Sequence, residues 1–498
     1  MRSALISISF ILILVFYLTS AGETYWVDAG NQSPPYLGTR QHPWPHPGYA
    51  CHPDYHRLSP GDTINVLPGV YLVNPRNRLS KIHIRVNNSN PHSAPVVFRG
   101  YEFHNDDKVF IRVKSYESEH GIFIDHRSHN VVIEDFYISN AFQPGRDLAH
   151  PAGVKVQGSG CIVRYNHIYG CHIGIFASSY NMHNPSLKLQ IYGNVISQSG
   201  EAGIRIKGAQ HCKIYSNLLY NNGERDEPAA SITIYRTTGT QIYNNTIITY
   251  NAAAIELYRG TNSHAEPCRR CEIFDNICVK LRGGDNPIFS VHYTMKRIES
   301  NKYHHNTWYN PERDCLFNFG GWTHHTELQR FNDYIRALPR NGVNGRGEVV
   351  RDPELESNFF LDIHSPEVND GSRPSAEANL NRATTFAIQA PDIGLVDRGY
   401  HQLPYRHSLN PPWYLPPPEE PVFDDGSDEA GISLIVENEP IQQAFLYNIL
   451  GQKVAVLTSD RLSAVRNEIN NRHLANGLYI LNLKTASANQ SLKIIINR

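Results

Sequence analysis

Short stretches in which apolar and polar residues alternate recur along the middle of the chain. Each stretch opens on a small or apolar residue and places an apolar residue at every second position, as a half-buried β-strand requires. β-Branched residues dominate these stretches, which favours strands over helices. The stretches begin at Gly121, Gly153, Gly174, Gly203, Ser231, Ala254 and Ile288.

An asparagine between apolar residues follows the alternating stretches. These positions are Asn166, Asn194, Asn217, Asn245 and Asn276, with Asp135 one repeat earlier and Asn306 one repeat later, at intervals of 23 to 31 residues. Each repeat has room for two or three short strands, and repeats of this kind stack into a solenoid. We therefore predict a right-handed parallel β-helix with coils about 4.8 Å apart. The asparagines are expected to stack as a ladder at one bend, where asparagine tolerates unusual backbone angles.

Both ends of this repeat region resemble secreted pectate-lyase-like β-helix proteins. The segment 61–71, which reads GDTINVLPGVY, is similar to the first coil of those proteins. The segments 360–371 and 391–394 are similar to their closing coils, although Glu367 stands where a small or apolar residue is usual. The resemblance covers roughly residues 24–405. It implies the fold, and it says little about the chemistry.

The N-terminus has the pattern of a secretory signal peptide. Arg2 precedes an apolar run from Ala4 to Leu18, and small or polar residues follow. The run is short for a transmembrane helix, which needs about 20 residues. We predict a signal peptide over residues 1–22 and the β-helix over residues 23–409, with no transmembrane segment in the mature chain. An uncleaved membrane anchor is the alternative.

The composition changes near the C-terminus. Residues 410–430 form a proline-rich, acidic linker, and residues 431–498 contain alternating strands that predict a small antiparallel β-sandwich. The sequences at 446–452, 476–479 and 493–496 resemble the type A sorting domain of the type IX secretion system. This resemblance implies passage through the periplasm and across the outer membrane, and a secreted or surface-attached protein. The type IX secretion machinery would be a partner. A generic β-sandwich binding module is the alternative.

Charge and cysteine content narrow the class further. The chain has 46 Lys and Arg against 47 Asp and Glu, a balance that argues against general nucleic-acid binding. Its eight cysteines permit disulfides in an exported protein. Cys161 and Cys212 occupy equivalent positions in the repeat, however, so a stack of buried free thiols is an equally serious interpretation.

Outward positions of the recurring strand are expected to form two columns on one face. The first column contains Phe123, Lys155, Phe176, Arg205, Thr233, Glu256 and Ser290. The second contains Asp125, Gln157, Ser178, Lys207, Tyr235, Tyr258 and His292, with Arg236 and Arg259 just beyond. At about 4.8 Å per coil, the charged and aromatic part of these columns extends over roughly 15–20 Å, the scale of several sugar rings.

These columns suit a polysaccharide lyase that cleaves a uronate-containing polymer by β-elimination. Such an enzyme neutralises the uronate carboxylate, removes the α-proton with a base and protonates the leaving oxygen. We predict Lys207 as the base, Arg236 and Arg205 as ligands of the carboxylate, and Tyr235 or Tyr258 as the proton donor. Residues assigned to the same site are Glu256 in the catalytic set and Arg259, His292 and Lys155 for binding substrate.

A finer resemblance concerns chondroitinase-B-like and alginate-lyase-like β-helices. There a base lysine precedes the coil asparagine by about nine residues, and an arginine stands at the same place one coil later. Lys207 lies ten residues before Asn217, and Arg236 lies nine before Asn245. The NGES-type motif of that family is missing, so calcium-dependent chemistry is only suggested. The acidic turn that would hold Ca²⁺ through oxygen ligands contains Asn222, Glu224, Asp226 and Glu227.

Two other functions remain open at this point. A glycoside hydrolase needs two suitably spaced carboxylates, and the columns give Glu256 no acidic neighbour in the adjacent coils. The Arg205-Ile-Lys207 element resembles one in β-helical polygalacturonases, but the paired aspartates of that family are absent. A non-catalytic, glycan-binding or adhesive surface protein is the other alternative, because β-helices host all three functions. For the favoured function, a polysaccharide lyase, the expected partner is an anionic polysaccharide.

Overall fold

The computed structural model describes two parts of the chain. The first is residues 22–401, with gaps at 75, 87–92, 102–107, 115–119, 142–149, 180–187, 224–229, 259–266, 282–285, 292–299, 313–314, 320–324, 327, 337–344, 357–358, 363, 379, 381–382, 384, 386–391 and 393. The second is the backbone of four strands between residues 443 and 496. The expected signal peptide, apart from Gly22, and the expected linker lie outside the described residues.

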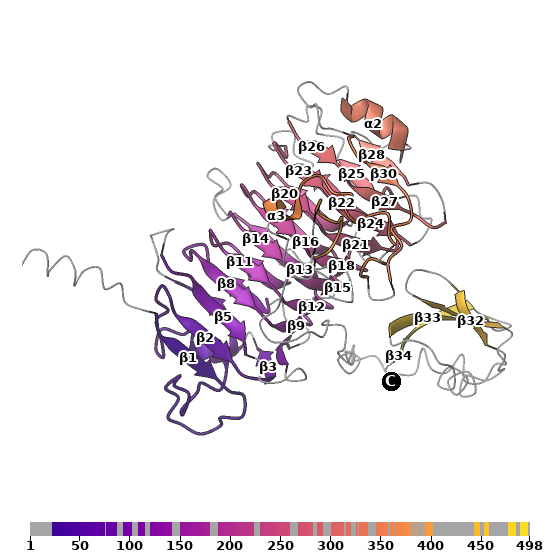
Figure 1. Cartoon of the computed structure of the whole chain (residues 1–498). Helices are drawn as coiled ribbons and strands as arrows, with labels where there is room; N and C mark the ends of the chain where they lie inside the picture. The colour runs from indigo at the N-terminus through magenta and orange to yellow at the C-terminus, as the bar shows by residue number, and fades with distance from the viewer. Residues whose placement is uncertain are drawn as a thin grey trace, which may run out of the picture. The chain divides into compact units, whose positions relative to one another are not determined.

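Three ten-stranded sheets run the length of the first part, and each coil gives one strand to each sheet (Figure 1). The first sheet contains β1 (Thr24–Val27), β2 (Thr63–Val66), β5 (Val96–Gly100), β8 (Val131–Glu134), β11 (Ile162–Arg164), β14 (Gln190–Tyr192), β17 (Lys213–Tyr215), β20 (Gln241–Tyr243), β23 (Glu272–Phe274) and β26 (Lys302–His304). The second contains β3 (Gly69–Val73), β6 (Val109–Val113), β9 (Tyr137–Ser139), β12 (His167–Tyr169), β15 (Val195–Ser197), β18 (Leu218–Tyr220), β21 (Thr246–Thr249), β24 (Ile277–Lys280), β27 (Thr307–Tyr309) and β30 (Val349–Val350). The third contains β4 (His83–Ile84), β7 (Ile122–Ile124), β10 (Ala152–Val156), β13 (Ile173–Ser178), β16 (Ala202–Lys207), β19 (Ala230–Tyr235), β22 (Ala253–Tyr258), β25 (Phe289–Val291), β28 (Phe317–Phe319) and β29 (His325–Thr326).

The strands pair in parallel from coil to coil, except for β29, which is antiparallel to β28. In the third sheet Ile204 pairs with Ile232 and Ile206 with Ile234, and all four side chains are fully buried. This register confirms the predicted parallel β-helix, because a shift of one residue would turn every apolar side chain outward.

The predicted asparagine ladder is continuous from Asn166 to Asn306. The Nδ2 of Asn166 donates to the Oδ1 of Asn194 at 3.1 Å, and the same bond recurs through each later coil at 2.9–3.0 Å. Each Oδ1 also accepts from the backbone N–H of the preceding ladder asparagine. The placement of Asp135 in the ladder was wrong by one residue. Phe136 occupies that position and contributes only its N–H, which donates to Asn166.

Aromatic rings beside the ladder form a structural stack. Tyr192, Tyr215, Tyr243 and Phe274 stack with ring centroids 4.8–5.0 Å apart. Tyr165 does not continue this column, because Arg164 is the residue that pairs with Tyr192. Tyr165 instead takes the left-handed bend position, at φ 57°.

The interior is apolar, and its thiols are not cross-linked. All eight cysteines are free, and seven of them are buried. Cys161, Cys212 and Cys271 stand just before β11, β17 and β23, the strands of alternate coils in the first sheet. Of the two interpretations of the cysteine spacing, the structure therefore has buried free thiols, which recur in alternate coils and do not stack directly on one another.

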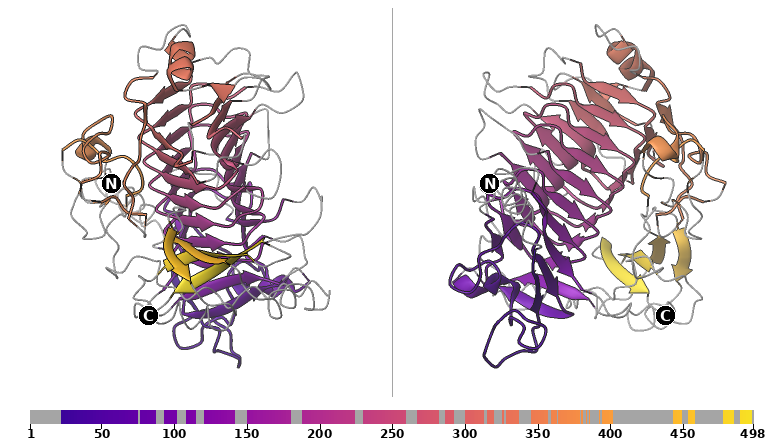
Figure 2. Two further views of the ribbon diagram at one scale, coloured as in Figure 1. Left: turned by 90° about the vertical axis from the view of Figure 1, so that its right-hand side faces the viewer. Right: turned by 60° about the vertical axis from the view of Figure 1, so that its left-hand side comes forward.

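A short helix covers the last coils of the solenoid. Helix α2 (Leu328–Arg336) lies beyond the final strands in both views of Figure 2. Its Phe331 is 1% exposed and stacks on Phe317 at 4.9 Å between ring centroids. The apolar core of the terminal coil is thereby shielded from water.

Residues 366–401 do not add coils, contrary to the expectation for the closing segment. Within the part that the structure describes, this segment contains the short helix α3 (Ser375–Ala378) and lies along the outside of earlier coils (orange in Figure 2). Asn244 Nδ2 donates to the carbonyl of Asp397, and the N–H of Gly399 donates to the carbonyl of Asp275.

The unusual Glu367 of that segment has a structural role. Its carboxylate is fully buried and accepts from Thr307 Oγ1 and Arg351 Nε, both at 2.6 Å. It also pairs with the buried Arg398, at 3.5 Å. A charged residue is stable at this position because every oxygen has a partner.

The chain divides into two compact units. The first holds residues 1–353, 366–385 and 389–408, and the second holds 354–365, 386–388 and 409–498. In the second unit β31 (Gln443–Asn448), β32 (Lys453–Leu457), β33 (Gly477–Lys484) and β34 (Asn489–Ile496) form an antiparallel sheet. The predicted boundaries at 409/410 and 430/431 stay predictions. Among the described residues, no helix combines the length and the apolar character that crossing a bilayer demands.

Candidate functional site

The first predicted column, and the second from Ser178 to Tyr258, are present on the outer face of the third sheet. Pairing along the first column joins Phe123, Lys155, Phe176, Arg205, Thr233, Glu256 and Ser290 in successive strands. Pairing along the second joins Ser178, Lys207, Tyr235 and Tyr258. The spacing of these side chains is therefore set by the hydrogen bonds between strands.

Much of the first column is withdrawn from water, although its side chains point out of the solenoid. Glu256 is 5% exposed, and Phe176 and Thr233 are each 6% exposed. The side chain of Arg205 is 19% exposed. Charged groups that are this buried need an ionic or hydrogen-bonding partner.

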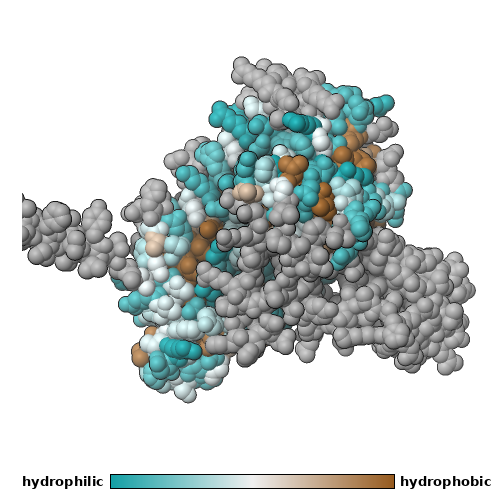
Figure 3. All heavy atoms as spheres, viewed as in Figure 1, coloured by the Kyte–Doolittle hydropathy of each residue, from teal (hydrophilic) through white to brown (hydrophobic). Residues whose placement is uncertain are grey.

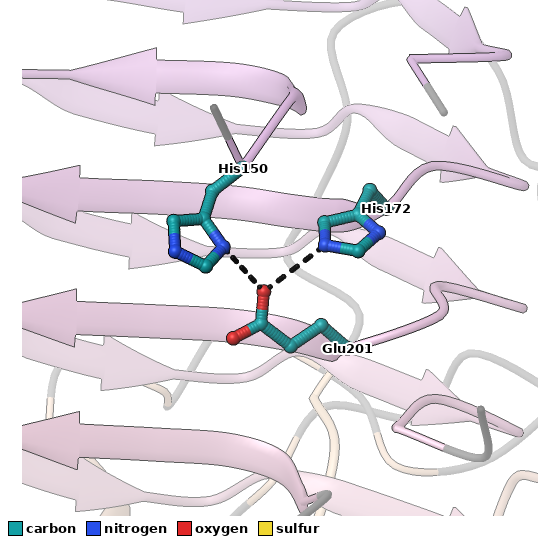
Figure 4. A group of neighbouring side chains, drawn as sticks. All are labelled: His150, His172 and Glu201. Atoms are coloured by element: carbon teal, nitrogen blue, oxygen red, sulfur yellow. Dashed lines mark hydrogen bonds and ion pairs between the residues drawn. The ribbon is translucent and has the colours of Figure 1, made fainter. Parts of the chain in front are cut away.

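Arg205 is ion-paired with Glu201, which lies four residues earlier, on the turn that precedes β16. Two imidazoles meet the same carboxylate. The Nδ1 of His150 lies 2.9 Å from Glu201 Oε2, and the Nε2 of His172 lies 3.2 Å from the same oxygen. Figure 4 shows the two rings on either side of that oxygen. Sequence reasoning missed this cluster.

A signal for part of this cluster exists in the sequence. His172 and Glu201 each stand two residues before the glycine that opens an alternating stretch, at Gly174 and Gly203. They therefore occupy the same position in consecutive coils, since Ile173 pairs with Ala202. His150 is displaced by one residue from that position, because Ala152 is the partner of Ile173.

Burial, together with the charges of neighbouring cations, shifts the pKa values of three groups in the site. The pKa of His150 is lowered to about 4, chiefly by burial and further by Arg205, His172, Lys207 and Lys155. The pKa of Lys207 is lowered by burial and by the charges of Arg205 and Arg236. Burial raises the pKa of Glu256 to about 7, against the opposing effect of Arg205. These groups lie close enough to act on one another electrostatically.

The remaining predicted residues fall into two groups. Lys207 Nζ lies 5.6 Å from the ring centroid of Tyr235, Arg236 lies 5.8 Å from it, and Tyr258 is 5.6 Å from it. Lys155 Nζ lies over the ring of Phe176 at 5.0 Å. Arg259, His292, Glu224, Asp226 and Glu227 lie outside the described residues.

The structure gives Asn222 a different role from the expected calcium ligand. Its amide is fully buried, with Oδ1 accepting from the N–H of Ser199 at 3.0 Å and Nδ2 donating to the carbonyl of Ile196 at 2.8 Å. These bonds tie one coil to the next, and they use the oxygen that a cation would need. Asn222 therefore belongs to the framework.

Comparison with protein families agrees with this architecture. Residues 120–301 match the family model described as "Right handed beta helix region". Residues 427–497 match the one described as "Secretion system C-terminal sorting domain". This chain is an exported right-handed parallel β-helix protein. Its sorting domain directs the β-helix through the type IX secretion system to the cell surface or the extracellular space.

Several solved structures are similar to this β-helix protein at low sequence identity. Pectate lyase Pel9A is 11% identical with a TM-score of 0.43, over 76% of this chain and 97% of that one. The GH136 lacto-N-biosidase from Eubacterium ramulus is 13% identical with a TM-score of 0.36, over 66% and 67%. PfbA, a surface adhesin of Streptococcus pneumoniae, is 9% identical with a TM-score of 0.31, over 54% and 83%. A search of curated proteins found no match.

Proposed function

We propose that this exported β-helix protein acts on a carbohydrate polymer, and that it is a polysaccharide lyase which cleaves a uronate-containing chain by β-elimination. The observation that carries the proposal is the position of Lys207, between cations and phenols on the outer face of the third sheet. Burial and neighbouring charge lower its pKa, as a base that works near neutral pH requires.

Each step of β-elimination has a candidate residue around Lys207. Arg236 would neutralise the uronate carboxylate, and this neutralisation matters most as enolate charge develops. Lys207 would then remove the α-proton. The phenol of Tyr235 or Tyr258, on the next two coils of the same column, would protonate the leaving oxygen.

The role of Arg205 differs from the expected one. Its guanidinium is ion-paired with Glu201, so its charge is already partly compensated before a substrate binds. In this proposal Arg205 acts mainly on Lys207, by disfavouring the protonated amine. Arg236 becomes the main ligand of the uronate carboxylate.

A glycoside hydrolase is the second candidate, and one observation favours it. Glu201 and Glu256 both interact with Arg205, although they are not neighbours in the columns. The pKa of Glu256 is raised to about 7 by burial, and Glu201 is ion-paired with the same guanidinium. A carboxyl group whose pKa is raised in this way is suited to act as the general acid of a glycoside hydrolase.

One assay separates these functions. The mature protein is incubated with a panel of neutral and uronate-containing polysaccharides, and both ultraviolet absorbance and new reducing ends are measured. A lyase produces unsaturated ends, which absorb, together with reducing ends; a hydrolase produces reducing ends alone. Binding without either product would contradict both candidates and leave the glycan-binding alternative.

A further inference from the structure

The cluster of His150, His172 and Glu201 supplies no group to the lyase reaction proposed above. These three residues come from three successive coils, on the turns that precede β10, β13 and β16. Each offers one ligand atom, and these atoms all lie within 4.8 Å of one another. They converge on a common point, as Figure 4 shows.

The donor set is one that metal ions select. Two imidazoles and one carboxylate bind Zn²⁺ in hydrolytic sites and other divalent transition metals in oxygenases. Three protein ligands leave further coordination positions for water or a substrate oxygen. Ca²⁺ and Mg²⁺ prefer a shell made of oxygen ligands, so two nitrogen donors favour a transition metal over either of them.

The carboxylate is held in an orientation suitable for this role. One oxygen of Glu201 pairs with Arg205, and the other faces both imidazoles. An outer partner that fixes a metal-binding carboxylate in this way is a common feature of metal sites. Arg205 is itself anchored within β16, whose strand hydrogen bonds join it to both neighbouring coils.

Positive charge nearby opposes a metal ion and must be weighed. Lys155, Arg205 and Lys207 all act electrostatically on His150, and a divalent ion would feel the same charges. Repulsion of this kind weakens binding but does not remove the preference for nitrogen donors. A metal high in the affinity order, such as Zn²⁺, is therefore a better fit than Mn²⁺ or Fe²⁺.

We propose that His150, His172 and Glu201 form a binding site for a divalent transition-metal ion, with Zn²⁺ as its favoured occupant. The site lies in the same region as Lys207, so a bound ion would place a Lewis acid beside the lyase residues. The proposal does not depend on the lyase assignment, because metal binding is measured without a substrate.

The experiment uses full mature protein purified without a polyhistidine tag. After treatment with a chelator and dialysis, Zn²⁺ is added, excess is removed, and bound metal is counted by elemental mass spectrometry. About one Zn²⁺ per chain is expected for a single site of this kind. Replacement by Co²⁺ should give the visible absorption of a tetrahedral or five-coordinate ion. Protein that retains no Zn²⁺, or that prefers Ca²⁺, would overturn the proposal.

Variants connect the ion to these residues. Glu201→Gln and His172→Ala should each lose the bound Zn²⁺ and the Co²⁺ absorption, because each variant removes one of the three ligands. His42→Ala, at an exposed histidine, is the matched control and should bind as the wild type does. Circular dichroism verifies that each variant folds. Equal Zn²⁺ binding by the wild type, folded Glu201→Gln and folded His172→Ala would refute the assignment.

Discussion

Glu201 and Arg205 are ion-paired across the start of β16, and this pair joins the two halves of the candidate site. On the Glu201 side are the two imidazoles, and on the Arg205 side are Lys207 and Glu256. The carboxylate and the guanidinium thus connect residues from four coils, those of β10, β13, β16 and β22. A change at either residue is expected to affect protonation on both sides.

Lys207→Ala tests the proposed base. The variant should lose at least ~10²-fold in turnover, as is typical for removal of a general base, while substrate binding largely survives. Initial rates with the best polysaccharide from the panel provide the measurement. Lys213→Ala, at an exposed lysine on β17 of the first sheet, is the control. Full activity in Lys207→Ala, or an equal loss in the control, would exclude the assignment.

Asn217→Ala tests the ladder. The amide of Asn217 is fully buried and donates to the carbonyls of Ile191 and Tyr215 and to Asn245. The substitution leaves buried acceptors unsatisfied, at a cost of about 1–3 kcal/mol for each group, so the melting temperature should fall clearly. Gln190→Ala, on the outer face of β14, should have little effect by the same measurement. Similar melting temperatures for both variants would mean that the ladder does not stabilise the fold.

Glu272 should make the protein sensitive to acid. Hydrogen bonds from His304 and Gln241 and the charge of Lys302 lower its pKa to about 2, in spite of burial. Because the folded-state pKa is depressed, this stabilisation is present above about pH 4.5 and is lost as the pH falls toward 2. The free energy of unfolding of Glu272→Gln should depend less on pH in this window than that of the wild type, measured by urea unfolding. The exposed Glu377→Gln is the control, and parallel profiles for Glu272→Gln and the wild type would contradict the prediction.

Deletion of residues 431–498 tests the role of the sorting domain. The β-helix has a core of its own, so the shortened protein should fold and accumulate in the periplasm instead of outside the cell. Fractionation and immunoblotting give the distribution, and protease resistance verifies folding. The truncated protein should not appear in the medium or on the surface; if it does, the domain is dispensable for export.

Most of the fold followed from two local patterns. The alternation of apolar and polar residues predicted which side of each strand faces the core. It placed Arg205 and Lys207 on the outer face, in agreement with the strand register. The asparagine spacing located the ladder. Its first position escaped the pattern because a ladder end needs only a backbone N–H, which Phe136 supplies as well as asparagine does.

Two other features depend on contacts that no local pattern reports. The segment 366–401 is held against earlier coils by bonds such as the one between Asn244 and Asp397, which are 153 residues apart. The cluster of His150, His172 and Glu201 lies on turns between strands. The number of residues in these turns varies from coil to coil, so neither the alternation within strands nor the asparagine spacing predicts it. His150 is brought to Glu201 across 51 residues, and only the stacking of three coils makes them neighbours.

The asparagine ladder ends on an acidic residue. Asn306 is the last of its asparagines, and its Nδ2 donates to the buried Glu348 at 2.8 Å. Each of the six ladder amides also donates to a backbone carbonyl of the preceding coil, so every rung ties its coil to both neighbours. Hydrogen bonds arranged in such a row polarise one another, and a change at one rung is therefore felt in the coils on either side of it.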